Sequence, residues 1–181
     1  YRSRMGFASP DMLSFEKTPG YFRTANAPRN ALNDLPKHVK FILLVKDPIQ
    51  RSISEFKHDS ERLLSDDEKR LLTEGRASVS RTGYTEGRRF ENEILLQNGD
   101  VNTESVTIDT SVYSKHFRRW LRYFPRDRFL IIEYNNLLRN VSFQLQRVER
   151  FLGLRPFFRD EMFGYYHDTK LCFVQSRNHR M

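Results

Sequence analysis

The sequence contains a single cysteine, Cys172, among its 181 residues. One cysteine excludes an internal disulfide framework and a CxxC redox or metal site. The thiol is then either a buried group or half of a bridge to a cysteine outside this chain. No stretch is long and apolar enough to span a membrane, and no signal peptide opens the chain. Because the sequence begins at Tyr1 and ends in the basic run SRNHRM, we expect a fragment, with any anchor or export signal upstream.

Several motifs of nucleotide and metal chemistry are also missing. The sequence has no GxxxxGK(S/T) phosphate loop, no GxGxxG dinucleotide motif and no GxSxG nucleophile elbow. Its five histidines lack the spacing of metal ligands, so we assign no metal. A recognition-helix pair and RNP aromatics are not apparent either, which argues against nucleic acid as the partner.

What the chain does have is enough apolar and aromatic material for one folded domain. Hydrophobic residues make up 38% and charged residues 30%, with fifteen Phe and eight Tyr, as in globular rather than disordered proteins. The formal net charge of +8 is consistent with an anionic partner. Nucleic acid, an anionic membrane and an acidic polysaccharide fit that charge equally well, and so does a basic surface without any such partner.

Apolar runs predict three strands, at Met12–Phe15, His38–Lys46 and Arg128–Tyr134. The second run shows little alternation, which is typical of a parallel strand buried on both faces. Helical patterns alternate with these strands along the chain. That order predicts an α/β domain with a central parallel sheet and flanking helices.

Three helices have clear start or stop signals. Asp47-Pro48 predicts an N-cap and a first helical turn, followed by an apolar face of Ile49, Ile53, Phe56 and Leu63. The clearest helix has a Ser or Thr cap, ends at Pro125 and has an apolar face of Tyr113, Phe117, Trp120, Leu121 and Phe124. A third helix runs over Val141–Leu152 and stops at Gly153.

The segment from about residue 65 to residue 106 is polar and irregular. We interpret it as a surface insertion within a single domain that covers residues 1–181. A short helix is predicted near Asp67–Thr73, and a second at Glu91–Gln97.

The sequence around Asp47-Pro48 suggests an anion pocket. Lys46 ends a predicted strand, and ligands of open α/β sheets bind beyond the carboxyl ends of the strands. The next helix directs its free N–H groups and positive dipole end to the same place, and Ser54 on its second turn can donate a hydroxyl. Lys17, at another predicted strand end, could stabilise charge on a leaving group. Alternatively, both lysines are solvated surface cations and Ser54 is a surface serine.

Two further patterns stand outside this pocket. Lys115, Arg118, Arg119 and Arg122 form a basic stripe that could hold a polyanion, although a solvated helix face is the default explanation for such a run. Asn140-Val141-Ser142 is an acceptor pattern for N-glycosylation. It matters only if the protein is secretory.

Five segments, taken in order, resemble the heparan sulfate sulfotransferases, most closely the glucosaminyl 3-O-sulfotransferases. FEKTPGYF is similar to that family's EK(S/T)PxYF, and ILLVKDPIQRSISEF to its (I/L)VR(D/E)PxxRAxSxY. TSVYSKHFRRWLRYFP is similar to (S/T)xYxxHLxxWLxYFP, RVERFLGL to VxxFLGL, and FGYYHDTKLCF to (F/Y)YFNxTKGFxC. These matches run from about Phe15 to Phe173, most of the chain.

The resemblance implies a P-loop-kinase-like sulfotransferase fold. It implies transfer of a sulfuryl group from 3′-phosphoadenosine 5′-phosphosulfate (PAPS) to a glucosamine 3-hydroxyl of heparan sulfate, with PAP as product. In the matching positions, Lys46 and Ser54 would bind the donor's 3′-phosphate, and Lys17 would lie near the transferred sulfate. The family setting is the Golgi lumen, in a type II membrane protein. There Asn140 would be a usable glycosylation site and Cys172 would pair with a cysteine beyond Met181.

The chain also departs from the family pattern. Lys46 replaces an arginine, which keeps the charge but loses the bidentate fork. His58 replaces a glutamine that contacts the substrate. The family's 5′-phosphosulfate loop and its glutamate base would precede Tyr1, and a basic closing loop would follow Met181. We therefore expect the isolated chain to be inactive or nearly so, while the full protein transfers sulfate.

Three alternatives stay open at this stage. One is an N-sulfotransferase domain, which shares the EK and VRDP segments. Another is a catalytically silent module that binds heparin or another polyanion. A nucleic-acid binder is the third.

Overall fold

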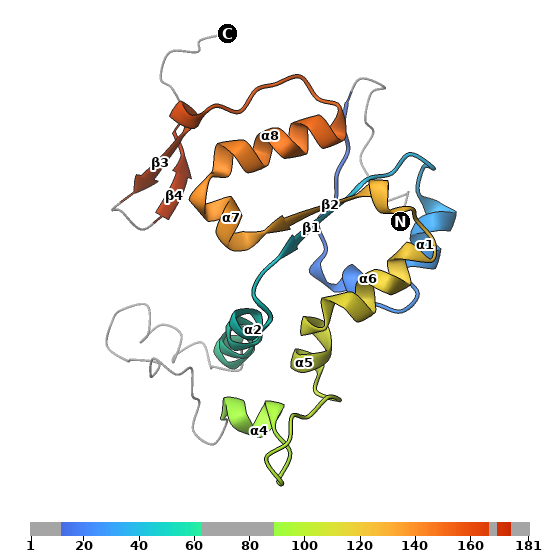
Figure 1. The fold of residues 1–181 in the computed structure, drawn as a ribbon, viewed down its shortest axis with the longest axis vertical. Helices are drawn as coiled ribbons and strands as arrows, with labels where there is room; N and C mark the ends of the chain where they lie inside the picture. Colours follow the sequence, from blue (N-terminus) through green and yellow to red (C-terminus); the bar gives the residue numbers. More distant parts are fainter. Residues whose placement is uncertain (1–11, 63–88, 167–169, 175–181) are drawn as a thin grey trace.

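A computed structural model describes residues 12–62, 89–166 and 170–174 of the chain. Its centre is a parallel pair of strands, β1 (Phe41–Val45) and β2 (Phe129–Glu133), in which Phe41 lies opposite Phe129 and Val45 opposite Glu133. A parallel pair requires a long crossover, and here the chain returns through helices between the two strands (Figure 1). The predicted parallel arrangement of these two strands is confirmed.

The remaining elements surround this pair of strands. In Figure 1, α8 lies above the strands, whereas α6 and α1 lie below and to the right. The elements before β2 are the 3₁₀ turn η2 (Pro19–Phe22), α1 (Ala27–Asp34), α2 (Pro48–Arg62), α4 (Phe90–Ile94), α5 (Val106–Ser111), α6 (Tyr113–Leu121) and η3 (Arg126–Arg128). After β2 come α7 (Tyr134–Arg139), α8 (Val141–Leu152), η4 (Asp160–Met162) and the antiparallel hairpin of β3 (Phe163–Tyr166) and β4 (Lys170–Phe173).

The core is aromatic and lies between α6 and the two strands. Trp120, Phe124 and Phe129 are buried, and the half-buried ring of Phe41 lies among them. The centroid of the Phe41 ring is 5.0 Å from that of Trp120, 4.7 Å from that of Phe124 and 5.0 Å from that of Phe129. Aromatic pairs at such distances add about 0.5–1.5 kcal/mol each beyond the area they bury. Most of the predicted apolar face thus lies in the core, but Leu121, which was predicted to belong to it, is 38% exposed.

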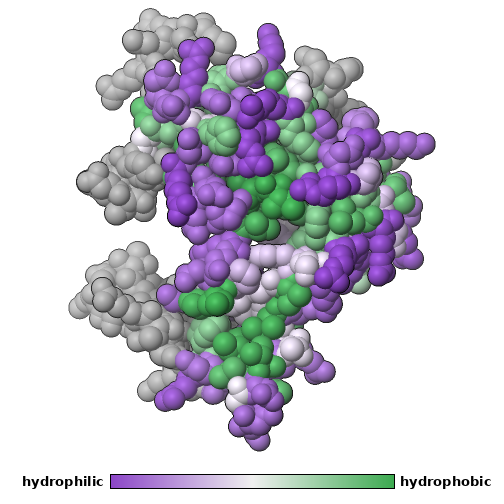
Figure 2. Space-filling view, viewed as in Figure 1, coloured by the Kyte–Doolittle hydropathy of each residue, from purple (hydrophilic) through white to green (hydrophobic). Residues whose placement is uncertain are grey.

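Strand β1 is not buried on both faces, contrary to the sequence prediction. Ile42 and Leu44 expose 43% and 56% of their surface, while the alternate residues of the strand are half-buried toward the core. Figure 2 shows hydrophobic atoms at the surface over the two strands. The reason is that the described residues cover only the face of β1 that carries Phe41 and Leu43. An unbroken apolar run therefore does not show by itself that both faces are covered.

Three local predictions were wrong. Residues 12–18 have no regular structure, and Phe15 is 85% exposed, so the predicted strand at Met12–Phe15 is absent. Ile49 is 67% exposed and does not join the apolar face of α2. The helix predicted around Tyr113 forms as α6, but the predicted Ser or Thr cap is absent: its N-cap is Val112, with φ −80° and ψ 68°, and no side chain caps it. Leu63 and the helix predicted at Asp67–Thr73 lie outside the described residues.

Other signals were confirmed. Asp47 caps α2, because its Oδ1 accepts the backbone N–H of Gln50 at 2.9 Å. Gly153, with φ 76°, ends α8 in the left-handed conformation that glycine favours. A helix does form in the second half of the predicted insertion, as α4, and its Phe90 ring lies 5.4 Å from the buried Phe56 ring of α2.

Asn140 is expected to stabilise the fold by capping α8. It caps α8, since its Oδ1 accepts the backbone N–H of Phe143 at 3.0 Å. Asn140→Ala should lower the free energy of unfolding by about 1 kcal/mol in a urea titration. Asn140→Asp should keep the cap and the stability while removing any glycan acceptor. Equal losses in both variants of unglycosylated protein would show that the cap does not stabilise α8.

Candidate active site

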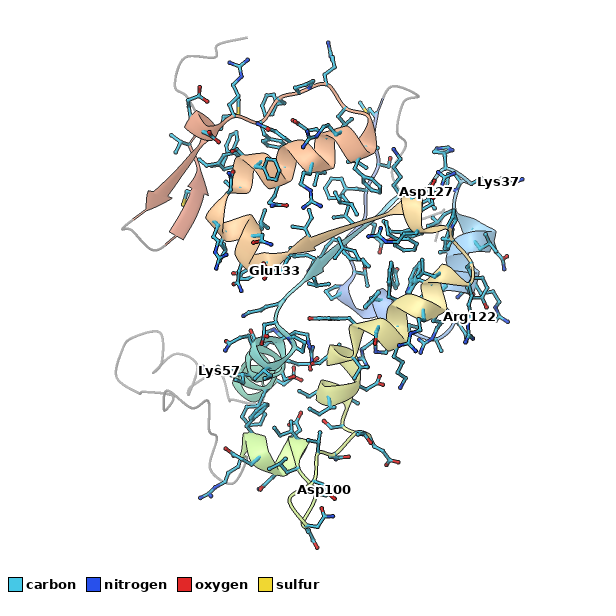
Figure 3. All side chains as sticks on the ribbon, viewed as in Figure 1. Lys37, Lys57, Asp100, Arg122, Asp127 and Glu133 are labelled. Carbon is cyan, nitrogen blue, oxygen red and sulfur yellow. The ribbon has the colours of Figure 1, made fainter. Side chains whose placement is uncertain are left out.

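Lys46 follows β1 directly and is half-buried. Its Nζ lies 5.3 Å from the centroid of the Tyr134 ring, at the start of α7. Glu133 is nearby in the sheet register, but its two carboxylate oxygens accept the backbone N–H groups of Asn135 and Asn136, each at 2.8 Å (Figure 3). In the described part of the chain, Lys46 has no ion pair. Its ammonium group is therefore held against an aromatic ring and remains available to an anion.

The N-terminus of α2 contributes less to anion binding than the sequence predicts. The carboxylate of Asp47 accepts the N–H of Gln50, one of the free donors expected there. Pro48, at the first helical position, has no N–H at all. The negative charge of Asp47 also offsets the positive end of the helix dipole. Affinity for an anion must therefore come mainly from side chains.

Ser54 and His58 are exposed on α2, one helical turn apart. Residues four apart share a face of a helix, and Asp47 lies on the same face two turns before Ser54. His58 has its Nδ1 3.4 Å from Asp59 Oδ1 and is 68% exposed. These two predicted residues therefore occupy one side of α2, the side that begins next to Lys46.

Lys17 is exposed on the irregular segment before η2. Among the described residues, no hydrogen bond or ion pair joins it to Lys46 or Ser54. The turn that follows it is fixed, because Trp120 donates Nε1–H to the carbonyl of Phe22 at 3.1 Å. Arg119 donates to the carbonyl of Arg23 at 2.8 Å.

Tyr113 links the segment that follows Lys17 to the end of β1. Its hydroxyl donates to the carbonyl of Lys46 at 3.0 Å, and its ring centroid is 6.4 Å from that of Phe22. The sequence prediction counted Tyr113 only as an apolar residue of its helix. A phenol on the inner face of a helix needs a hydrogen-bond partner, and that requirement was the available signal.

Arg51 was also missed, and it fixes α2 against α5. Its side chain is 17% exposed and donates to three acceptors: Ser111 Oγ at 2.8 Å, the Thr107 carbonyl at 2.5 Å and Glu55 Oε2 at 2.9 Å. The neighbouring Ser52 hydroxyl is 2.8 Å from Ser111 Oγ. This network sets the rotation of α2 and so the direction in which Ser54 points.

Replacing Arg51 should therefore destabilise the domain. Arg51→Lys keeps the charge but cannot reach three acceptors in one plane, so we expect a loss of about 1–3 kcal/mol in urea unfolding. Lys57→Gln changes an exposed cation on the outer side of the same helix (Figure 3) and should stay within about 0.5 kcal/mol of wild type. If Arg51→Lys proves as stable as Lys57→Gln, the network does not fix α2 against α5.

His116 is a further buried group that the sequence prediction assigned to no site. It is 1% exposed, and its Nε2 lies 2.8 Å from the carbonyl oxygen of Asp109 and 3.4 Å from Oδ2 of the same residue. A hydrogen bond from Lys115 holds the pKa of Asp109 below its ordinary value of 3.8, and the charge of His116 acts in the same direction. This lowered pKa stabilises the fold above about pH 4, and the contribution is lost as the pH falls through the folded-state pKa. The contact between His116 and Asp109 therefore fixes the corner between α5 and α6.

Asn140 and Cys172 lie away from this site. Asn140 is exposed at the start of α8, and Cys172 is an exposed free thiol in β4. Within the described ranges, no group of three or more His, Cys, Asp or Glu side chains is arranged to hold a metal ion.

Comparison with known families identifies the chain. The family model for the sulfotransferase domain matches residues 27–171. The chain belongs to the sulfotransferase family. The matched range of this sulfotransferase chain includes Lys46, Ser54 and His58, whereas Lys17 precedes it and Cys172 follows it.

Two curated relatives of this sulfotransferase chain carry more specific names. Heparan sulfate glucosamine 3-O-sulfotransferase 5 of Mus musculus is 32% identical over 157 residues, which are 86% of this chain and 40% of the relative. Heparan sulfate glucosamine 3-O-sulfotransferase 6 of Homo sapiens is 29% identical over 170 residues, 94% of this chain and 43% of the relative. The chain thus spans about two fifths of the length of these relatives.

A solved structure agrees with the fold of this sulfotransferase chain. The crystal structure of a sulfotransferase from Alicyclobacillus acidocaldarius matches with a TM-score of 0.52 at 16% identity, over 82% of this chain and 53% of that one. The predicted α/β sulfotransferase fold is confirmed.

Proposed function

We propose that this chain is part of an enzyme that transfers a sulfuryl group from PAPS to heparan sulfate, at the 3-hydroxyl of glucosamine. The main observation in support is Lys46, a half-buried cation at the carboxyl end of β1 with no ion pair among the described residues, inside a matched sulfotransferase domain. The names of the relatives support heparan sulfate as the acceptor.

The residues around Lys46 fit a phosphate group. Lys46 supplies a charge, and the exposed hydroxyl of Ser54 supplies a donor on the adjacent helix. PAPS would bring the sulfuryl group and two further anionic groups, of which we assign the 3′-phosphate to Lys46 and Ser54. The negative charge of Asp47 would repel a second anion close to the same helix end.

Lys17 and His58 complete the proposed site. An ammonium group at Lys17 would stabilise the charge that develops on the leaving phosphate oxygen as the new bond from sulfur to the acceptor oxygen forms. His58, exposed on the face of α2 that carries Ser54, would contact the acceptor sugar. The acceptor's hydroxyl proton must go to a base, and we assign none to the described residues.

A silent polyanion-binding protein is the second candidate, and the N-terminus of α2 favours it. The carboxylate of Asp47 accepts one of the backbone N–H groups there, which is then not free for an anion. In addition, a lysine holds a phosphate less tightly than the arginine of the family pattern. Both features weaken the donor site. They leave the basic surface unaffected.

The test is to incubate the natural full-length form of the protein with PAPS and heparan sulfate and to locate new sulfate by disaccharide analysis. Sulfate at the glucosamine 3-hydroxyl is the expected result. Sulfate on nitrogen would move the protein to the N-sulfotransferase group. Heparin binding without any transfer would favour the silent binder.

The cellular setting is part of the proposal. We place the enzyme in the Golgi lumen, as a type II membrane protein with its anchor outside this chain, glycosylated at Asn140 and with Cys172 bridged to a cysteine beyond Met181. None of the described helices combines the length and the apolar character needed to cross a membrane. A shift in gel mobility after glycosidase treatment, absent in Asn140→Asp, would test the glycan.

A further inference from the structure

The outer face of α6 carries a row of cations that the proposed donor site does not use. At 3.6 residues per turn these side chains lie opposite Tyr113 and Trp120, which face the core. Arg119 binds the carbonyl of Arg23, which brings a further exposed arginine beside the row. Figure 2 shows hydrophilic side chains gathered over this part of the molecule, and Figure 3 shows Arg122 at its outer edge. We call this set, Lys115, Arg118, Arg119 and Arg122, the α6 cation row.

The charge of the row is poorly compensated. Lys115 pairs with Asp109, but in the described part of the chain no carboxylate pairs with Arg118 or Arg122. Like charges three or four residues apart cost a helix a few tenths of a kcal/mol per pair, and solvated faces usually mix the two signs. The helix dipole favours Arg118 and Arg119 in the last turn of α6, but not Lys115 near its start. The charges of Arg118 and Arg122 are therefore left without a carboxylate in the described part of the chain and can meet an external anion.

The shape of the row fits a linear polyanion better than a single small anion. Lys115 and Arg122 are seven residues apart, about 10 Å along the helix axis at 1.5 Å per residue. Because the cations are spread along the helix, they do not converge on one phosphate. The row begins two residues after Tyr113, whose hydroxyl binds the carbonyl of Lys46. The row thus lies on the side of α6 that faces away from this bond, and the helix connects it to the end of β1.

We propose that the α6 cation row is a second contact surface for a sulfated polysaccharide. It holds the acceptor chain beyond the sugar at which transfer takes place. The identity of the polymer rests on the proposed function, since the relatives are named for heparan sulfate. The consequence is that long chains bind more tightly than short ones, because only a long chain reaches both the acceptor site at His58 and the row.

The test is heparin binding by the natural full-length protein, titrated without PAPS at several salt concentrations. The double variant Arg118→Gln and Arg122→Gln removes two cations that have no partner among the described residues. Its Kd for long heparin should rise about tenfold, and the slope of log K against log salt should flatten by about one for each cation removed. A heparin tetrasaccharide, too short to span both surfaces, should lose less affinity than long heparin.

The matched control is Arg150→Gln with Arg155→Gln, which removes the same charge from exposed positions at the end of α8. Its Kd should change less than about twofold. Equal weakening in both double variants would mean that net charge alone binds heparin, and unchanged binding in the first would also overturn the proposal. A third result would also overturn the proposal: duplex DNA binds as tightly as heparin at matched salt and loses as much affinity in the first double variant. Heparin binding that depends on the row without any sulfate transfer would keep this inference and reject the proposed function.

Discussion

Lys46→Ala is expected to lower kcat/KM for PAPS about 100-fold in the natural full-length protein. A charged hydrogen bond to phosphate in a partly buried site contributes about 2–5 kcal/mol when one partner is truncated, and 1.36 kcal/mol corresponds to a factor of ten. The 3′-phosphate does not change during transfer, so the loss should appear mainly as a higher KM for the donor, with a smaller change in kcat. Initial rates at varied PAPS with heparan sulfate in excess measure both.

Lys46→Arg is the informative partner of that variant. The guanidinium fork can donate two hydrogen bonds to one phosphate and can stack on the Tyr134 ring that lies 5.3 Å from the Lys46 ammonium. We expect the KM for PAPS to stay the same or to fall. If Lys46→Ala leaves the KM for PAPS unchanged, Lys46 does not bind the donor. Ser114→Ala, at an exposed position of α6, is the neutral control.

The sequence predicted the framework of the fold because its signals are local. Asp47-Pro48 begins α2 and Gly153 ends α8 through contacts within one turn of helix, so the residues themselves determine the boundary. The parallel pairing of β1 with β2 followed from two apolar runs separated by helices. These features need no knowledge of distant contacts.

The failures depend on what lies beside each element. Whether Ile42 faces a neighbour or solvent is decided by segments far away in sequence, and the apolar run is the same in both cases. The predicted Ser or Thr cap of α6 did not form, because Ser111 belongs to a separate helix, α5, that ends directly before Val112. No rule of spacing could indicate either result.

The candidate site shows the same division. Lys46 and Ser54 could be proposed from the sequence because they belong to one strand-to-helix unit. Tyr113 and Arg51 were missed because their partners are 67 and 60 residues away, at Lys46 and Ser111. Their positions on inner helix faces were a signal, since buried polar groups need partners, but the partners themselves are visible only in the structure.

Trp120→Ala should have the largest effect on stability. Trp120 is 6% exposed, and its ring lies 5.0 Å from Phe41 and 6.3 Å from Phe129. Removing a buried tryptophan costs about 3–5 kcal/mol, which is a large part of the 5–15 kcal/mol that stabilises a typical domain. The variant should unfold at much lower urea. Leu121→Ala, at the next position but 38% exposed, should cost about 1 kcal/mol or less.

Trp120→Phe separates packing from the hydrogen bond that holds the segment after Lys17. It keeps an aromatic ring in the core but loses the Nε1–H that donates to Phe22 at 3.1 Å. We expect a loss of about 1–2 kcal/mol, because the carbonyl of Phe22, in a part-buried position, is left without this partner. The protein should stay folded at 25 °C, yet kcat should fall more than the KM for PAPS rises, since we assign Lys17 to the leaving group and Lys46 to the bound donor. A Trp120→Phe variant that unfolds earlier while keeping the wild-type kcat would mean that the turn after Lys17 does not need this bond to place the lysine.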